Sequence, residues 1–391
     1  MNLTFKTVGQ TPLSDIWFTY YGLDPANGMK PSHLDASGKI VPNEPSEKPT
    51  TALSIQVSSA PSFNFPKLSA GRLYISFEQP LKLTVDPAGN PIPPQSANPN
   101  DPNYKIPWDF FEIDYIPSGS DELFNFNLST VQSANLPLAF QVAGTEPSTK
   151  QPVSYVRGWK PRGYTAFISA LRAVEDFKGL ILPGTQRVLA PGTAITAFSQ
   201  GVIPKPLIAA DYLKAYIAQV WVKYEKETLT FVGDPPAGSN SFVTWTGQVE
   251  NGQFVFTTKD FPKGKLKPIV LSMPSTAALF ENNFNFCVSG EGNPKTNQQN
   301  YALQLFGTLC AAFNRSMMLT TSELTNSSSG AWCQDKAAFY QDPTTNHYAK
   351  HIHENTVGGL AYAFQSDDHC DTSSFVSVIN PTGLTINIVQ R

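Results

Sequence analysis

The chain has 391 residues, of which 41% are hydrophobic, 12% aromatic and 15% charged, and its formal charge is −3. This length suits roughly two domains of about 150 residues each, which is ample to bury a hydrophobic core. The near balance of 28 basic and 31 acidic residues gives no electrostatic reason to expect nucleic acid or an anionic membrane as a partner. No segment approaches the roughly 18 consecutive apolar residues of a membrane span. Many prolines and aromatic residues with little charge exclude disorder and are typical of a β-rich protein with long ordered loops.

The first ten residues lack the charged and apolar regions of a secretory signal. They indicate a strand instead, because Leu3, Phe5 and Val8 stand among polar residues. Three explanations stay open: a leader removed earlier, export by another route, or a protein that stays inside the cell.

Strands are predicted for most of the first 150 residues. Residues 1–30 contain an aromatic cluster (Trp17, Phe18, Tyr20 and Tyr21), and a Pro-rich loop follows over residues 31–64. Residues 71–77 alternate apolar and polar side chains, which predicts a half-buried strand. After a second Pro/Asn-rich loop over residues 86–107, we expect strands over 110–116 and 136–142, separated by a polar connection near 118–122.

Helical periodicity appears only from the middle of the chain onward. It predicts helices near residues 164–177, 209–226 and 298–318, whose apolar stripes are best interpreted as core packing. Strand patterns return between residues 228 and 257 and again over 360–388. The sequence therefore predicts a β-rich body interrupted by a helix-containing insert, with a groove where the two parts meet.

All four cysteines lie in the last third of the chain, at Cys287, Cys310, Cys333 and Cys370. No two of them form a CxxC pair, which argues against a zinc ribbon. Two disulfides, in any of three pairings, or free buried thiols are the alternatives.

Three histidines and a glutamate cluster in one short segment. His347 and His351 have the i, i+4 spacing that places two metal ligands on one helix face, with His353 and Glu354 next to them. The segment lacks the HExxH order, and residues 342–345 before it indicate a turn. We therefore favour packing and hydrogen bonding over a metal site, and we expect no metal.

Two pairs of carboxylates are candidates for chemistry. Glu112 and Asp114 are two apart on a predicted strand, so they share a face about 6.6 Å apart. Two carboxyl groups flanked by aromatic residues are typical of sugar-cleaving sites, but from these two residues alone a solvated strand face with an ion pair is the favoured interpretation. Asp367 and Asp368, followed by His369, form the second pair.

Several blocks of sequence match one known family in their order along the chain. They are Gly71–Phe77, Asn98–Asn103, Phe111–Glu112, Tyr212–Tyr224, Thr308–Arg315, Asn346–Asn355, Ala361–Phe364 and Asp367–Asp368. The chain resembles glycoside hydrolase family 64, the laminaripentaose-producing β-1,3-glucanases, which belong to the thaumatin-like superfamily. The segment Asn135–Leu136–Pro137 is also similar to plant thaumatin-like proteins.

The resemblance implies a mainly β fold, in which a thaumatin-like β-sandwich or barrel carries an inserted mixed α/β domain with a wide groove between them. The barrel would comprise residues 1–150 and 336–391, and the mixed domain residues 151–335. The groove would receive a β-1,3-glucan, and the protein would be an extracellular monomer without a cofactor.

The resemblance also implies an inverting mechanism in which Glu112 is the general acid. The aspartate that serves the family as general base aligns with Gln132, and about four extra residues separate the two positions, within residues 118–123. Glutamine orients water but accepts no proton at neutral pH, and losing a general base typically removes about 10² to 10⁴ in rate. Asp114 is a possible substitute, and Asp121 or Glu122 could swing in from the inserted residues.

The remaining site residues follow from the resemblance alone. Substrate contacts are expected from Asn127, Thr130, His347, Tyr348, Asp367 and Asp368. Cys287 and Cys310 match a cysteine pair of the family, which would leave Cys333–Cys370 as the second disulfide.

Three functions therefore remain for the groove. The first is β-1,3-glucan hydrolysis with Glu112 as acid and a displaced or substituted base. The second is a binding protein that keeps the glucan groove without turnover, and acts on cell walls, against fungi or as a toxin-like effector. A purely structural role is the third.

Overall fold

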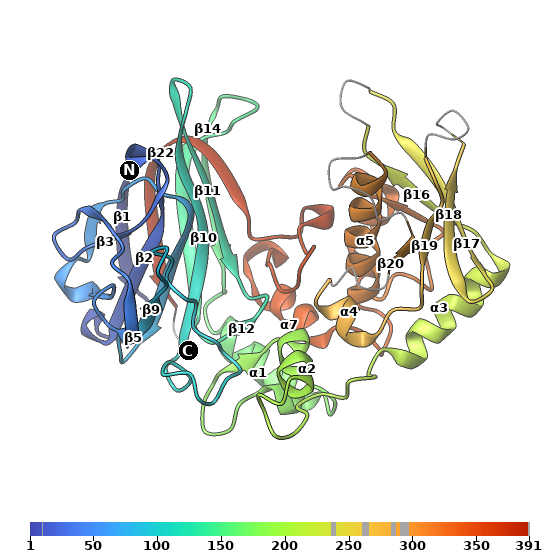
Figure 1. The fold of residues 1–391 in the computed structure, drawn as a ribbon, viewed down its shortest axis with the longest axis horizontal. Coiled ribbons are helices and arrows are strands. Elements are labelled where there is room, and N and C mark those ends of the chain that lie inside the picture. Colours follow the sequence, from blue (N-terminus) through green and yellow to red (C-terminus); the bar gives the residue numbers. More distant parts are fainter. Residues whose placement is uncertain (10, 236–239, 260–265, 283–286, 290–296, 390–391) are drawn as a thin grey trace.

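The computed structural model describes residues 1–9, 11–235, 240–259, 266–282, 287–289 and 297–389, with two lobes joined by a helical base (Figure 1). One lobe is built around a large sheet and the other around a smaller one. The prediction of a mainly β fold is confirmed, since the described residues form sheets of 12 and 6 strands and two short two-stranded sheets.

The larger sheet is antiparallel along its main path. Its order is β14 (Pro152–Gly158), β13 (Leu138–Thr145), β22 (Val376–Ile388), β11 (Asp121–Ser129), β10 (Trp108–Ser118), β8 (Ser69–Phe77), β2 (Ile16–Asp24), β3 (Lys30–Leu34) and β4 (Ile40–Pro42). Beside this path, β1 (Asn2–Thr7) pairs in parallel with β22, β6 (Ile55–Gln56) pairs with β2, and β7 (Ser62–Asn64) pairs with β1. Two short sheets join β5 (Ser46–Thr50) with β9 (Leu83–Val85) and β12 (Ser133–Ala134) with β15 (Val188–Leu189).

The hairpin of β10 and β11 follows directly from the alternation of its side chains. Phe111, Ile113 and Tyr115 point into the core, where Phe111 stacks on Phe126 of β11 at 4.7 Å between ring centroids. The residues between them face the opposite side, because successive side chains of a strand alternate. The hairpin turn uses Gly119 at φ 62°, a conformation that glycine adopts without steric cost.

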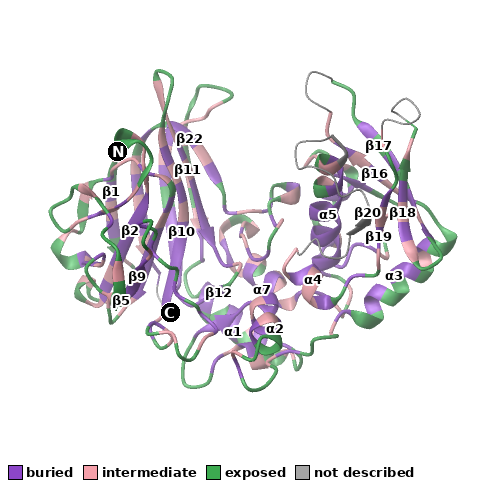
Figure 2. Ribbon diagram, in the orientation of Figure 1, coloured by how far each residue is buried: buried purple, intermediate pink, exposed green. Residues whose placement is uncertain are grey.

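The second lobe holds the smaller sheet and its helices. The strand order is β20 (Cys287–Ser289), β19 (Ile269–Leu271), β18 (Gln253–Thr258), β17 (Val243–Glu250), β16 (Leu229–Gly233) and β21 (Glu323–Thr325). Helix α5 (Asn297–Asn314) lies between this sheet and the larger lobe, whereas α3 (Lys214–Lys226) packs against β17 (Figure 1). Figure 2 shows α5 and the central strands of the large sheet as largely buried, and the loops at the periphery as exposed.

The base consists of helices that lie between the two lobes (Figure 1). They are α1 (Gly163–Ala173), α2 (Pro191–Ser199), α4 (Thr276–Phe280) and α7 (His347–Asn355), whereas the short α6 (Ala331–Gln334) contacts β21 of the second lobe. On α1, Tyr164, Phe167, Ile168 and Leu171 are buried at helical spacing, and Phe167 packs edge-on against Tyr348 of α7. The side chain of Asn346 caps α7 by accepting a hydrogen bond from the Ala349 amide, so the helix begins directly after the predicted turn.

The structure places helices in all three predicted regions, but it differs from the predicted strands and loops in three places. Residues 31–64, predicted as a loop, contain most of β3 and the short strands β4, β5, β6 and β7, because their backbone pairs with neighbouring strands. Strand β11 lies where the sequence indicated only a connection, because the few residues near 118–122 form the tip of a hairpin rather than a long loop. The strand expected from residue 360 begins only at Val376. Residues 360–375 are irregular because Ser366, Cys370 and Asp371 have positive φ angles, which interrupt any ladder.

One cysteine prediction is wrong. The structure contains the Cys333–Cys370 disulfide, whereas Cys310 is a free thiol buried within α5, so the expected Cys287–Cys310 bridge is absent. The side chain of Cys287 lies outside the described part of the structure. Burial raises the pKa of the Cys310 thiol and keeps it in the unreactive protonated form.

We expect alkylation to distinguish the two patterns. In unfolded but unreduced protein, iodoacetamide should label Cys310 and leave Cys333 and Cys370 unlabelled, as read by peptide mass spectrometry. Reduction before labelling should add the latter two. Protection of Cys310 until reduction would show that it is disulfide-bonded after all.

Candidate active site

Three polar side chains form a row across neighbouring strands of the large sheet. Glu112 on β10 stands directly opposite Arg72 of β8 on one side and Asn127 of β11 on the other. Asn127 Nδ2 lies 3.5 Å from Glu112 Oε2, and Asn127 Oδ1 accepts a hydrogen bond of 2.6 Å from Ser374. The Arg72 guanidinium lies over the Phe110 ring at 5.3 Å from its centroid. This row presents a half-buried carboxyl group between an amide and a cation.

Asp114 follows Glu112 on the same face, as predicted from the strand pattern. Its Oδ1 accepts hydrogen bonds from the Ala70 amide at 2.7 Å and from the Ser69 hydroxyl at 3.0 Å. Ala70 has a positive φ of 45°, so this carboxylate stabilises an unfavourable backbone conformation. Asp114 is therefore tied to the strand beside it.

The groove in front of this row consists of two adjoining cavities. The larger, of about 780 Å³, lies along the large sheet and is lined by Asp114, Asn127, Arg157, Asp371 and Phe375 among others. The smaller, of about 640 Å³, extends to the second lobe, where Leu303 and Gln304 of α5 line it. Arg72, Glu112, Tyr362 and Asp368 line both cavities, so the two meet at these four residues.

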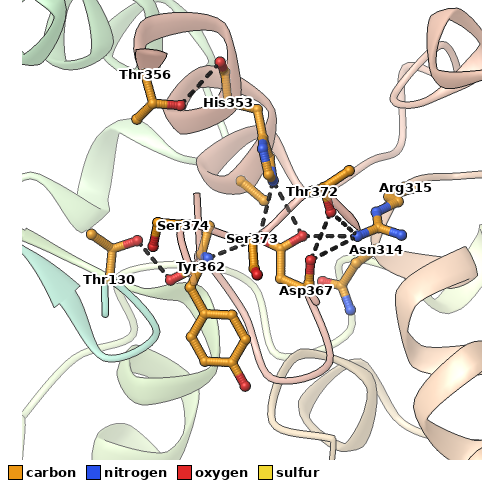
Figure 3. Close-up of polar contacts among 12 residues, drawn as sticks. Thr130, Asn314, Arg315, His353, Thr356, Tyr362, Asp367, Thr372, Ser373 and Ser374 are labelled. Atoms are coloured by element: carbon orange, nitrogen blue, oxygen red, sulfur yellow. Dashed lines mark hydrogen bonds and ion pairs between the residues drawn. The ribbon is translucent and has the colours of Figure 1, made fainter. Parts of the chain in front are cut away.

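The irregular segment 360–375 forms a further wall of the groove beside the end of β11, where Tyr362 bridges Ser129, and a buried ion pair holds it in place (Figure 3). Arg315 Nη2 lies 3.0 Å from Asp367 Oδ1, and both side chains are fully buried. The same nitrogen donates to the His369 carbonyl and to the Thr372 hydroxyl. On its other side, Asp367 Oδ2 lies 3.0 Å from His353 Nε2 of α7 and accepts from the Ala363 amide at 2.8 Å. The pair thus links α5, α7 and the groove wall.

The part of this wall that carries Asp368 is bent tightly. Ser366, Cys370 and Asp371 all adopt the left-handed conformation that residues other than glycine rarely take. The Cys333–Cys370 disulfide and the Arg315–Asp367 pair hold the bend on either side of Asp368. Backbone strain of this kind persists only where the surroundings fix it, and it is concentrated at functional sites.

Gln132 is exposed in the groove and lines the same smaller cavity as Glu112. Its backbone carbonyl accepts a hydrogen bond from the Ala190 amide. Nearby, the buried Asn135 donates from its backbone amide to Asp109 Oδ2 at 2.9 Å, and this bond anchors the segment after β11. Gln132 thus faces the same space as Glu112, and its alignment with the general base of the family stays a prediction.

The extra residues of the β10–β11 hairpin lie far from Glu112. Glu122 is five residues along β11 from Asn127, which corresponds to about 16 Å, and its side chain lies on the other face of the strand. There it accepts a hydrogen bond from Tyr115 and pairs with Lys67. Asp121, still nearer the tip, is bonded to Asn380. These contacts hold both carboxylates away from the groove.

Several predicted substrate contacts lie behind the groove instead of in it. Tyr348 and Thr130 are buried, and Thr130 bonds the Tyr362 carbonyl while its own carbonyl accepts from Tyr348. Asp367 is enclosed as described above. His347 is bonded to the Pro343 carbonyl and packs edge-on against Phe177; burial lowers its pKa. These residues position the groove wall, whereas Asn127 and Asp368 line the groove itself.

Among the groove-lining residues that the sequence analysis missed are Arg72, Tyr362, Asp371 and Phe375. Arg72 and Tyr362 stand within the matching blocks, but only the strand register and the course of the segment 360–375 bring them to Glu112. Phe375 did carry a signal in the sequence, because a large aromatic residue follows three small polar ones there. In the structure its side chain is 49% exposed.

The described residues contain neither a metal-binding cluster nor a membrane-spanning helix. Among them, no group of three or more His, Cys, Asp or Glu side chains is arranged to hold a metal ion. None of the helices they form is long and apolar enough to cross a membrane.

The family of the chain follows from comparison with known sequences. The family model described as β-1,3-glucanase, glycoside hydrolase family 64, matches residues 1–388. The chain belongs to this family. It is 26% identical over 330 residues to a glucan endo-1,3-beta-glucosidase of Cellulosimicrobium cellulans, a match that covers 84% of the chain and 53% of the relative. The chain thus spans about half the length of the curated relatives it matches.

Solved structures share the fold over the whole chain. A laminaripentaose-producing β-1,3-glucanase in complex with laminaritetraose is 23% identical, with a TM-score of 0.73, and the match covers 100% of this chain and 98% of the other. A β-1,3-glucanase domain from Clostridium beijerinckii gives the same values. At 23% sequence identity, this similarity shows that the fold is shared.

The buried ion pair makes a testable contribution to stability. We expect Asp367→Asn to lower the free energy of unfolding by about 3 kcal/mol, because it leaves the Arg315 charge buried without its partner. The neighbouring Asp368→Asn is the matched control; since that side chain is 65% exposed, its effect should stay within about 0.5 kcal/mol. Urea unfolding followed by circular dichroism measures both, and equal effects would contradict the importance of the pair.

Proposed function

We propose that this protein hydrolyses β-1,3-glucan in the groove between its lobes, with Glu112 as the general acid. Membership of family 64 supports the substrate class, and the observation that carries the proposal is the position of Glu112 where the two cavities meet. Together the cavities give room for several sugar units along the groove. The groove is open, as an enzyme that cuts within a chain requires.

The surroundings of Glu112 suit proton donation to a leaving sugar. Asn127 is within reach of one carboxyl oxygen and fixes its orientation through the bond to Ser374. Arg72, next to Glu112 in the row, stabilises the carboxylate that remains after the proton has left. The acid protonates the glycosidic oxygen as the C1–O bond breaks, while a water molecule attacks C1 from the opposite side and inverts its configuration.

Substrate contacts come from side chains that the groove exposes. Asn127 and Asp368 offer polar groups to sugar hydroxyls. Tyr362 and Phe375 offer aromatic faces of the kind on which sugar rings pack, because the C–H face of a pyranose is apolar. Their distribution along the larger cavity favours an extended polysaccharide over a small sugar.

A second candidate function is glucan binding without turnover. Gln132 supports it, because the residue aligned with the base of the family accepts no proton at neutral pH. In that case the groove would hold the polysaccharide of a cell wall without cutting it.

An extracellular location fits both functions. The Cys333–Cys370 disulfide supports it, since such bonds persist in oxidising environments. We also propose that the protein acts as a monomer, because residues of a single chain form both walls of the groove.

Replacing Glu112 tests the proposal directly. We expect the protein to release reducing ends from laminarin, and Glu112→Gln to lower that rate by about 10² to 10⁴, because the amide donates no proton to the leaving group. Retention on insoluble curdlan should be unchanged. Glu122→Gln, the same substitution at the hairpin tip, should leave the rate near the wild-type value. Retention on curdlan without any release by the wild type would favour the binding function.

Phe375 should contribute to glucan affinity. Covering roughly 50 Å² of its ring corresponds to about 1 kcal/mol, so Phe375→Ala should weaken laminarin-oligosaccharide binding about fivefold in a calorimetric titration. Phe242→Ala is the matched control, because Phe242 is equally exposed, at 49%, but lines neither cavity of the described groove. Equal affinities of the two variants would exclude Phe375 from the binding surface.

A further inference from the structure

We propose that Asp368 is the general base of the hydrolysis, in place of the residue at position 132. The inference rests on the proposed function, since it names the second carboxylate of the reaction for which Glu112 supplies the acid. It starts from a requirement: in an inverting reaction a carboxylate must take a proton from the attacking water, on the side of the sugar opposite the acid.

Three other acceptors that line these two cavities are less well placed. Asp114 projects from the same strand face as Glu112, and Ser69 and Ala70 hold its Oδ1, so it approaches the sugar from the side of the acid. Asp371 lines only the larger cavity. His369 lines the smaller one, but both its ring nitrogens have protein partners, the Ser366 carbonyl on one and Thr308 and Asn326 on the other.

Asp368 reaches the space in front of Glu112 from a different part of the chain. It lines both cavities together with Glu112, but it belongs to the segment 360–375, which adjoins the end of β11 and is not part of the strand that carries the acid. The two carboxyl groups therefore face the same space from different segments. The Asp368 side chain is 65% exposed, so it is open to water and to the sugar.

Tyr362 shares both cavities with the two carboxylates. Burial raises the pKa of the Tyr362 hydroxyl, and the negative charges of Asp368 and Glu112 raise it further. Its backbone is fixed by two hydrogen bonds from Thr130 to the Tyr362 carbonyl.

The immediate surroundings keep Asp368 ionised and in place. His369, whose Nδ1 lies 3.8 Å from Asp368 Oδ1, holds the pKa of this carboxyl below its usual range. The bend on either side is fixed by the disulfide at Cys370 and by the buried pair at Asp367. A base must be deprotonated and stationary, and these contacts provide both conditions.

The reaction balances with these two residues. The Asp368 carboxylate takes one proton from water as the oxygen bonds to C1, and the C1–O bond to the next sugar breaks. The oxygen of the leaving sugar takes the proton of Glu112. The products are two shorter chains, the new reducing end being the α-anomer, with Asp368 protonated and Glu112 ionised until solvent exchanges their protons.

The experiment compares variants in the folded full-length chain with laminarin. We expect Asp368→Asn to lower kcat by about 10² to 10⁴ with little change in retention on curdlan. In Asp368→Ala, sodium azide should restore turnover and give an α-glycosyl azide, because azide attacks C1 without losing a proton. Azide should not accelerate Glu112→Gln, whose defect lies at the leaving group.

Each contrary outcome is distinct. Near wild-type turnover by Asp368→Asn, together with an inactive Glu112→Gln, would overturn the role of Asp368 and leave the proposed hydrolysis standing. If Asp368→Ala is inactive and azide does not restore turnover, Asp368 positions the substrate and is not the general base. A gain of an order of magnitude or more in Gln132→Asp would place the base site at residue 132. No release by the wild type would overturn both the hydrolysis and this inference.

Discussion

The buried ion pair between Arg315 and Asp367 is the interaction on which the groove depends. Three aromatic rings, those of Trp332, Phe339 and Phe364, surround the Arg315 guanidinium with centroids 5.0–5.8 Å away. Removing two charges from water costs several kcal/mol per ion, and only close hydrogen bonds on both partners compensate for that. The pair is therefore stable only in one hydrogen-bonded geometry, and the backbone around it has few alternative conformations.

The ion pair also fixes the groove, because its contacts join segments that form or support the groove wall. Arg315 directly follows α5 of the second lobe, His353 belongs to α7 of the base, and Asp367 is adjacent to Asp368 in the groove wall. One network therefore fixes the position of the wall relative to the sheet that carries Glu112. The hairpin wall is rigid for another reason, since Phe111 and Phe126 stack behind it in the core. The inverting hydrolysis that we propose needs an acid and a base at a constant separation, because a water molecule must fit beside the base.

Much of the architecture could be predicted from local pattern. Alternation over residues 71–77 and 110–116 predicted strands with the correct inward faces, and helical spacing located α1, α3 and α5. The disulfide pattern could not be predicted this way, because pairing depends on which thiols the fold brings within bonding distance. The same holds for the segment 360–375, whose apolar residues resemble a strand but whose course is set by hydrogen bonds to Asp367.

The sequence by itself determined the family, the mainly β fold and the place of Glu112 on an alternating strand, because these depend on residue order and on the two-residue period of a β-strand. It also raised the expectation that Gln132 stands where the family has its base. Only the tertiary structure decided which side chains share the groove with Glu112. Arg72 and Asn127 come from neighbouring strands, and Tyr362 and Asp368 from a wall more than 200 residues further along the chain. Such proximity arises from strand register and from a buried charge network, neither of which leaves a periodic signal in the sequence.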